Sequence, residues 1–292
     1  MVFKVKAMLI DQILPQVVAV KGSLGDRLTA EGAAIGMAEG DTATLLAAIP
    51  AELLNAGAFL DSLTNLWRYE FGVPFEIVGS HYWGTHMWAP VAHLFTALTS
   101  AHNHLSAVQF AEYARRLSNP EKHQAILVEM IPAAKVNSAV PLEFEVAGLG
   151  AGNRTVDWFI SPSNERVVLL DVKNRTTDFI HQAEEMANDS SAQRPLHDPA
   201  LLFRSVEQKF LPAHPDAQLQ GVWICTHIKQ HEQSLNAAFS TLSADKVHFA
   251  IIGDWQPDAY VLARRPQDEQ FLYQLFNLQP SKRFTFTDTD EG

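Results

Sequence analysis

The chain has 292 residues, of which 47% are hydrophobic and 19% are charged, and its formal net charge is −11. These proportions are typical of a globular protein and exclude intrinsic disorder, while the acidic balance argues against a broad phosphate-binding surface. The single cysteine, Cys225, excludes an intrachain disulfide framework. Residues 1–20 have no convincing cleavage site, and no apolar run is long enough to cross a membrane. We therefore expect a cytoplasmic protein with no membrane partner.

The first part of the chain has the pattern of a mainly helical domain. Leucines recur at helical spacing over residues 41–66, with Pro50 interrupting, and residues 90–117 have the periodicity of two helices. Asn119 and Pro120 then break the pattern, because proline is well placed in the first turn of a new helix. We expect one domain of unknown role over residues 1–118 and a second domain over residues 119–292.

Residues 67–88 are dense in aromatic side chains and also carry His81 and His86. The two histidines are five residues apart, which does not place them on one face of a helix, and no acidic residue lies between them. The stretch is therefore more typical of an aromatic core or interface than of a metal site. Its alternative use is a surface that binds a protein partner or stacks on bases.

The second half has the order α-β-β-β-α-α-β-α-β, which predicts an α/β domain. The expected helices span residues 121–131, 178–188, 199–211, 232–242 and 268–278. The expected strands span residues 142–146, 155–160, 166–172, 220–226, 247–252 and 260–263. Cys225 falls within one of these strands and is expected to be a buried core residue.

The most informative stretch is a predicted β-hairpin over residues 155–175. Its second strand is apolar in the centre, which is typical of a strand buried on both faces, yet it ends in Asp171 and Lys173. With the turn centred near Asn164, Asp157 lies opposite Asp171, with the Cβ atoms within about 5 Å of each other. Side chains alternate across a strand, so Lys173 shares the face of Asp171.

Two carboxylates this close repel each other unless one is protonated or both share a cation. Paired carboxylates, together with water and substrate oxygens, are the ligands of a hard divalent ion such as Mg²⁺ or Mn²⁺. A lysine on the same face can orient an attacking water or stabilise a developing oxyanion. A D-x-K triplet at a strand end is also typical of a solvated face or a surface ion pair, so the triplet alone does not decide between the two interpretations.

The acid on one strand, the turn, the buried strand and the final Asp171-Val172-Lys173 triplet resemble the PD-(D/E)xK nuclease superfamily. Val156 stands where the superfamily name would place proline, and the resemblance covers at most residues 120–254. It implies a restriction-endonuclease-like mixed sheet flanked by helices, with an α-β-β-β-α-β core and the acids on its second and third strands. It also implies that Asp157 and Asp171 bind Mg²⁺ or Mn²⁺ and that Asp157, Asp171 and Lys173 are catalytic.

Families of this kind often add an acid from the helix before the first strand. Glu129 lies in an otherwise apolar run, where a charge is costly unless it is paired or binds metal. Glu121 lies at a helix N-terminus, where a carboxylate is favourable for local reasons. We therefore favour Glu129 as a further metal ligand, with an exposed position on an amphipathic helix as the alternative, and Glu145 as a weaker candidate.

A local basic rim can offset the acidic balance of the chain. Arg154, Arg166, Lys173 and Arg175 are expected around the site, and Lys209 on a later helix is either a phosphate contact or part of a solvated face.

The resemblance implies a metal-dependent nuclease that acts on nucleic acid, with DNA preferred over RNA by analogy with the superfamily alone. The alternative is a non-catalytic module that keeps the fold and binds a protein partner through the aromatic N-terminal half. A histidine-based hydrolase is disfavoured because the chain has no G-x-S-x-G or H-E-x-x-H motif.

Overall fold

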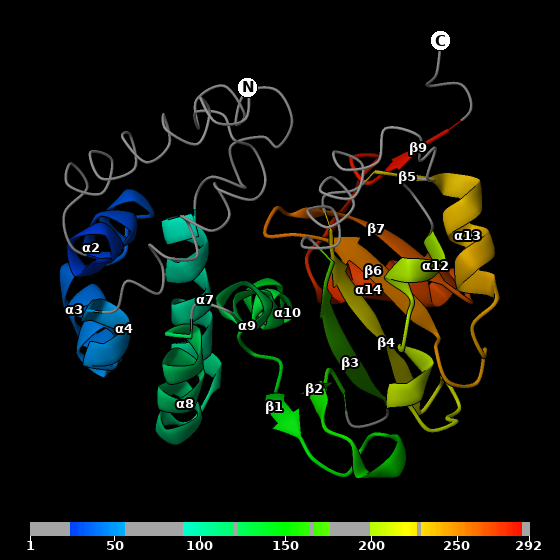
Figure 1. The fold of residues 1–292 in the computed structure, drawn as a ribbon, viewed down its shortest axis with the longest axis horizontal. Coiled ribbons are helices and arrows are strands. Elements are labelled where there is room, and N and C mark those ends of the chain that lie inside the picture. The colour runs from blue at the N-terminus through cyan, green and yellow to red at the C-terminus, as the bar shows by residue number, and fades with distance from the viewer. Residues whose placement is uncertain are drawn as a thin grey trace, which may run out of the picture. The chain divides into compact units, whose positions relative to one another are not determined.

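The computed structural model describes residues 24–55, 90–119, 122–163, 166–175, 199–226 and 229–287 (Figure 1). The chain divides into two compact units, residues 1–130 and 131–292. The division lies C-terminal to the boundary expected after residue 118, so the helix that follows Pro120 belongs to the first unit.

Within the described residues, the first unit consists of helices (Figure 1). Their bounds are α2 (Leu24–Ala34), α3 (Glu39–Ala48), α4 (Ala51–Asn55), α7 (Pro90–His104), α8 (Ala107–Leu117) and α9 (His123–Glu129). The helix expected over residues 41–66 is divided at Pro50 into α3 and α4, and its remainder lies outside the described residues. The aromatic stretch with His81 and His86 also lies outside them.

Helix α8 illustrates why the sequence is helical here. Its N-terminus carries a capping box in which Ser106 and Gln109 satisfy each other's free backbone N–H groups. Residues at helical spacing bury one face of the helix, namely Phe110, Tyr113, Ala114 and Leu117. No helix in the described ranges of the chain has both the length and the hydrophobicity that a membrane crossing requires.

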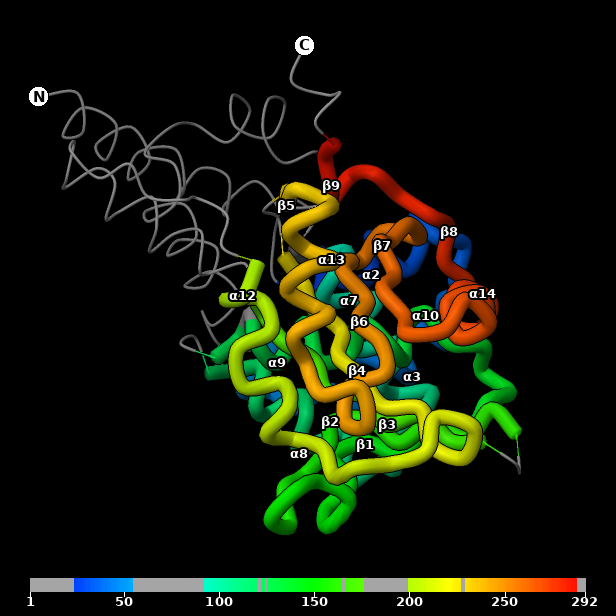
Figure 2. Tube along the Cα trace, turned by 90° about the vertical axis from the view of Figure 1, so that its right-hand side faces the viewer, coloured from blue at the N-terminus to red at the C-terminus, as the bar shows by residue number. Residues whose placement is uncertain are grey.

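The second unit is an α/β structure built on a seven-stranded mixed sheet with the order β1-β2-β3-β4-β6-β7-β8. Strands β1, β2 and β3 are antiparallel, β3, β4 and β6 are parallel, β7 is antiparallel to β6, and β8 is parallel to β7. The bounds are β1 (Leu142–Val146), β2 (Val156–Ile160), β3 (Val167–Asn174), β4 (Gln218–Cys225), β6 (Phe249–Gly253), β7 (Asp258–Ala263) and β8 (Gln279–Pro280). A second sheet pairs β5 (Gln230–His231) with β9 (Thr285–Phe286), which lie side by side in Figure 2.

Among the described residues of the second unit, the helices are α10 (Ile131–Lys135), α12 (Pro199–Leu202), α13 (Glu232–Ser240) and α14 (Pro266–Leu275), with short 3-10 helices η3 (Ala151–Asn153) and η4 (Glu207–Lys209). The prediction of one helix over residues 199–211 was wrong. The segment is α12, a turn and η4, and Ser205 in the turn has a left-handed φ of 67° that a continuous helix cannot contain. The helix expected over residues 178–188 lies outside the described residues.

The faces of the central strands determine where the hairpin acids lie. On one face Leu169, Val222 and Ile224 pack against buried side chains of α12 and α13. On the other face Trp223 meets the edge of the Phe276 ring, with centroids 5.3 Å apart. Side chains alternate along β3, so Asp171 continues the row of Leu169 and faces the side covered by α12 and α13. The expected burial of β3 and of Cys225 is confirmed.

Candidate functional site

The β2–β3 hairpin brings the two predicted acids together. Its ladder pairs Trp158 with Leu170 and Phe159 with Leu169, so the same register places Asp157 opposite Asp171. The backbone ladder stops before this pair. Instead, a carboxylate oxygen of Asp157 accepts a hydrogen bond of 2.6 Å from the backbone N–H of Val172. The hairpin therefore fixes the Asp157 carboxylate beside Asp171, where the β2–β3 pairing ends while β3 stays paired with β4.

Asp171 is the most buried charged group of the site, with a side chain that is 1% exposed. Lys173 Nζ lies 2.6 Å from Asp171 Oδ2, and Lys209 Nζ lies 2.7 Å from Asp171 Oδ1. Both contacts are ion pairs by distance, but neither buried oxygen accepts a hydrogen bond of regular geometry from the described residues. The two ion pairs compensate the buried Asp171 charge, because an unpaired charge in the interior is strongly destabilising.

Lys209 reaches this site from η4. Its ammonium also lies 3.8 Å from Asp157 Oδ1 and donates a hydrogen bond of 3.1 Å to the Thr155 carbonyl. Burial alone would lower the pKa of Lys209, but its contact with Asp171 and the charge of Asp157 outweigh burial and raise that pKa. Lys209 is thus a charged partner of both acids. The sequence had offered two other interpretations of Lys209, a phosphate contact or part of a solvated helix face.

The expected basic rim is present in part. Arg154 donates to the Gln208 carbonyl at 3.0 Å and Arg175 donates to the Arg204 carbonyl at 3.1 Å, which attaches both arginines to the segment that carries Lys209. The prediction that Arg166 borders the site was wrong. Arg166 lies at the opposite end of β3 from Asp171.

Arg166 is used structurally instead. Its guanidinium pairs with the fully buried Asp268 at 2.5 Å and lies over the Phe271 ring, 5.0 Å from the centroid. From Arg166 to Asp171 the extended strand covers about 16 Å, so one side chain cannot serve both ends.

The remaining predicted acids have other surroundings. Glu129 belongs to the first unit, where its carboxylate accepts two hydrogen bonds from Arg116, the shorter of 3.0 Å. Glu121 lies outside the described residues. Glu145 is exposed, and its backbone is left-handed with φ of 53°. Its neighbours Phe144 and Val146 pair with β2, but Glu145 does not pair with Asp157.

The donor set at the hairpin fits a hard divalent ion in chemistry, because Asp157 and Asp171 offer carboxylate oxygens on one face. Among the described residues, however, no group of three or more histidine, cysteine, aspartate or glutamate side chains is arranged to hold a metal ion. The two carboxylates are already matched by the two ammonium groups of Lys173 and Lys209. Any ion that binds there must therefore share the site with lysine side chains.

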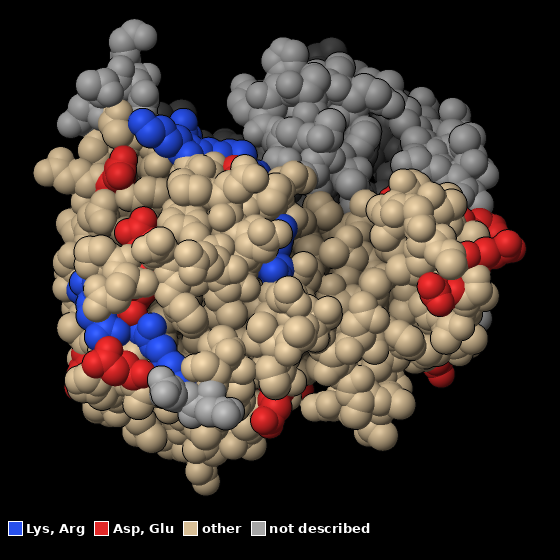
Figure 3. Space-filling model, turned by 180° about the vertical axis from the view of Figure 1, so that it is seen from behind, with Lys and Arg blue, Asp and Glu red and all other residues tan. Residues whose placement is uncertain are grey.

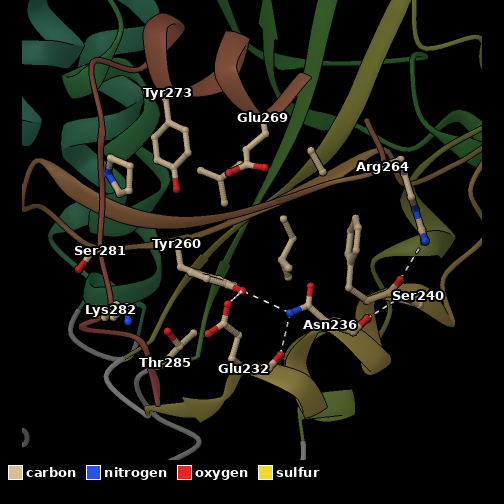
Figure 4. Close-up of a pocket in the computed structure, with 15 residues that line it drawn as sticks. Glu232, Asn236, Ser240, Tyr260, Arg264, Glu269, Tyr273, Ser281, Lys282 and Thr285 are labelled. Carbon is tan, nitrogen blue, oxygen red and sulfur yellow. Dashed lines mark hydrogen bonds between the residues drawn. The ribbon is translucent and has the colours of Figure 1, made fainter. Parts of the chain in front are cut away.

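A second candidate is a pocket of about 730 Å³ in the same unit, between α13, α14 and β7 (Figure 4). It borders Tyr260–Arg264, and β8 pairs only with the preceding Asp258 and Ala259, so the pocket lies along the uncovered part of the β7 edge. Tyr260 donates a hydrogen bond of 2.9 Å to Glu232, and burial raises the pKa of Tyr260 to about 12.

The positive and negative charges of the side chains around this pocket are equal in number. Glu232 and Glu269 are acidic, whereas Arg264 and Lys282 are basic, and all four are labelled in Figure 4. The Arg264 guanidinium donates to the carbonyls of Phe239 and Leu242, so it supports the end of α13. The lining therefore selects no particular charge in a ligand, and no residue of the pocket was singled out from the sequence.

No protein-family model, curated protein or solved structure matches the chain. The chemistry of the hairpin site is therefore inferred from its own residues.

Proposed function

We propose that the protein is a metal-dependent nuclease that hydrolyses phosphodiester bonds, with DNA as the favoured substrate. The observation that carries the proposal is the meeting of Asp157 and Asp171 at the end of the β2–β3 hairpin, with the Lys173 ammonium 2.6 Å from Asp171. The two carboxylates can bind a hard cation, and the ammonium beside them can contact a phosphate oxygen.

The order of elements around the hairpin supports the same proposal. Helix α10, the antiparallel strands β1, β2 and β3, a crossover that contains α12, and the parallel strand β4 follow in that order along the chain. This order agrees with the α-β-β-β-α-β order that the PD-(D/E)xK resemblance implies, with the acids on the second and third strands, except that its first helix is the five-residue α10 and not the helix expected over residues 121–131, which is α9 of the first unit. We therefore infer a restriction-endonuclease-like core within the mixed sheet.

In this proposal Asp157 and Asp171 hold Mg²⁺ or Mn²⁺. Glu129, the further ligand expected from the sequence, lies in the first unit, where Arg116 pairs with its carboxylate. When bound, such an ion lowers the pKa of water and offsets negative charge at the scissile phosphate.

The other groups of the hairpin position the reactants. The Val172 N–H holds the Asp157 carboxylate in place through its hydrogen bond of 2.6 Å. The Lys173 ammonium donates a hydrogen bond to a phosphate oxygen or orients the attacking water, and no covalent enzyme intermediate is needed.

Substrate docking would depend on local charge. The chain carries a net charge of −11, and on the face seen in Figure 3 the lysine and arginine side chains lie in small groups, several beside acidic ones, with no broad basic patch. Arg154, Lys173, Arg175 and Lys209 supply positive charge around the hairpin. Binding through so few phosphate contacts should be weak and should weaken further with added salt.

The second candidate function is a non-catalytic module that binds a protein partner. It is favoured by one observation, which is that the ammonium groups of Lys173 and Lys209 match the two carboxylate charges of Asp157 and Asp171. In that case the four charges are a partly buried ion-pair network around Asp171, and their loss would affect stability but no reaction.

Cleavage of plasmid DNA, single-stranded DNA and RNA in Mg²⁺ or Mn²⁺ separates the two functions. The wild-type protein is compared with Asp171→Asn and Lys173→Met, and with Lys246→Met as a control outside the site. We expect metal-dependent cutting by the wild type and the control, and a loss of at least about 100-fold in both site variants. Equal cutting by folded site variants, or no cutting by any protein, would reject the nuclease and favour the binding module.

A further inference from the structure

Lys209 lies where a cation shared by the two acids would sit. Its ammonium is 2.7 Å from Asp171 Oδ1 and 3.8 Å from Asp157 Oδ1. A divalent ion held by the Asp157 and Asp171 carboxylates would need this space, and two cations in contact repel each other. Metal binding and the observed position of Lys209 are therefore in competition.

The backbone beneath Lys209 is fixed, but its ammonium is on a flexible stem. Val206 and Phe210 on either side are 0% and 1% exposed, which anchors η4 in the core of the second unit. Arg154 further ties the segment to the site through the Gln208 carbonyl. The lysine stem has four carbons, so the ammonium can move away from the acids while the helix stays in place.

The charges at the site indicate what would draw the ammonium away. Asp157 and Asp171 are balanced by Lys173 and Lys209, so a divalent ion added to this set would bring two uncompensated positive charges. That charge is costly because it lies beside the ammonium groups of Lys173 and Lys209, which repel it. A phosphodiester backbone supplies both the missing negative charge and a new acceptor for a lysine ammonium.

We propose that Lys209 is a displaceable internal cation that makes binding of the divalent ion depend on bound phosphodiester backbone. In the free protein the Lys209 ammonium holds the two carboxylates. With DNA bound, the ammonium moves to a backbone phosphate and releases Asp157 and Asp171 to the ion. This inference rests on the proposed nuclease function and adds to it a regulation of the same site.

The coupling has a second consequence. Linkage between two ligands is reciprocal, so the ion must strengthen DNA binding by the same factor by which DNA strengthens binding of the ion. An enzyme of this kind would hold its metal ion only when a phosphodiester is present. Without DNA, Lys209 would supply the positive charge that Asp157 and Asp171 need.

The test measures Mn²⁺ binding by electron paramagnetic resonance, with and without a short DNA duplex whose integrity is checked on a gel. Full-length wild type, Lys209→Met, Lys209→Gln and the control Lys246→Met are compared, and folding of each is checked by circular dichroism. We expect DNA to tighten Mn²⁺ binding to the wild type and the control at least about tenfold. Both Lys209 variants should bind Mn²⁺ more tightly than the wild type without DNA, and DNA should add little.

Two outcomes overturn the inference and are distinguishable. Mn²⁺ binding that is equally tight in the wild type and the Lys209 variants, with no effect of DNA, would leave the metal site standing but reject the role of Lys209. Absence of Mn²⁺ binding in every protein, with and without DNA, would reject the metal site itself and with it the proposed nuclease. The two Lys209 substitutions differ in polarity, so the comparison survives if one of them does not fold.

Discussion

Lys135 is a group of the second unit whose ionisation should make the free energy of unfolding depend on pH. Its Nζ donates a hydrogen bond of 2.5 Å to the Trp255 carbonyl. Burial, partly offset by the charges of Asp254 and Asp258, lowers the pKa of Lys135 from 10.5 to about 8. Between these values the unfolded chain binds more protons than the folded one, so stability rises with pH in this window and is lost again as pH falls toward 8.

The size of the effect follows from the two pKa values. The difference between 10.5 and about 8 corresponds to about 3 kcal/mol of unfolding free energy in full, of which about 2 kcal/mol falls between about pH 7 and pH 9.5. Lys135→Met keeps most of the apolar stem and removes the titrating group. The unfolding free energy of this variant should therefore rise over that range by about 2 kcal/mol less than that of the wild type.

The assay is urea denaturation followed by tryptophan fluorescence at a series of pH values, since Trp158 and Trp223 are fully buried in the second unit. Lys246→Met serves as the control and should keep the wild-type dependence on pH. Parallel curves for the wild type and Lys135→Met would refute the reasoning, because they would mean that Lys135 titrates alike in the folded and unfolded chains.

Three further substitutions test particular contacts by urea denaturation. Glu145→Gly should stabilise the protein by about 1 kcal/mol, because it removes a left-handed non-glycine residue, whereas the matched control Glu143→Gly on the same strand should destabilise it. Arg166→Met should cost about 2 kcal/mol, because it takes one of two arginine partners from the buried Asp268, and an unchanged midpoint would contradict this account. Tyr260→Phe should cost about 1 kcal/mol through loss of a hydrogen bond of 2.9 Å to a glutamate, and no loss would mean that water replaces the hydroxyl.

The hairpin could be predicted from the sequence because its determinants are local. A turn cluster between two runs of β-forming residues fixes the register, and the register places Asp157 opposite Asp171. The burial of β3 followed from its unbroken apolar centre for the same reason. The mixed α/β class likewise followed from the order of the elements along the chain.

The partners of the acids were harder to predict, because they depend on contacts between distant segments. Lys209 reaches Asp171 from a 3-10 helix 38 positions later in the chain, and neither its helical context nor its neighbours specify that contact. Glu129 was expected to need a partner, and Arg116 on α8 supplies one through helix packing that periodicity alone does not locate.

The prediction that Arg166 lies at the site failed for a different reason. It is close to the hairpin acids in sequence, but an extended strand separates its two ends by the full length of the intervening residues. Its position could have been excluded from strand geometry. Its partner Asp268 could not have been predicted, because that contact joins β3 to a helix late in the chain.

The central claim is that Asp157 and Asp171 together hold the divalent ion at which a phosphodiester is cleaved. The most direct measurement is a crystal structure of the protein with Mn²⁺ and a short DNA, using the anomalous scattering of manganese to locate the ion. The account predicts a manganese peak bonded to both carboxylates, with the Lys209 ammonium moved from Asp171 to a phosphate. DNA bound at the hairpin with no manganese peak there, and with Lys209 still 2.7 Å from Asp171, would contradict it.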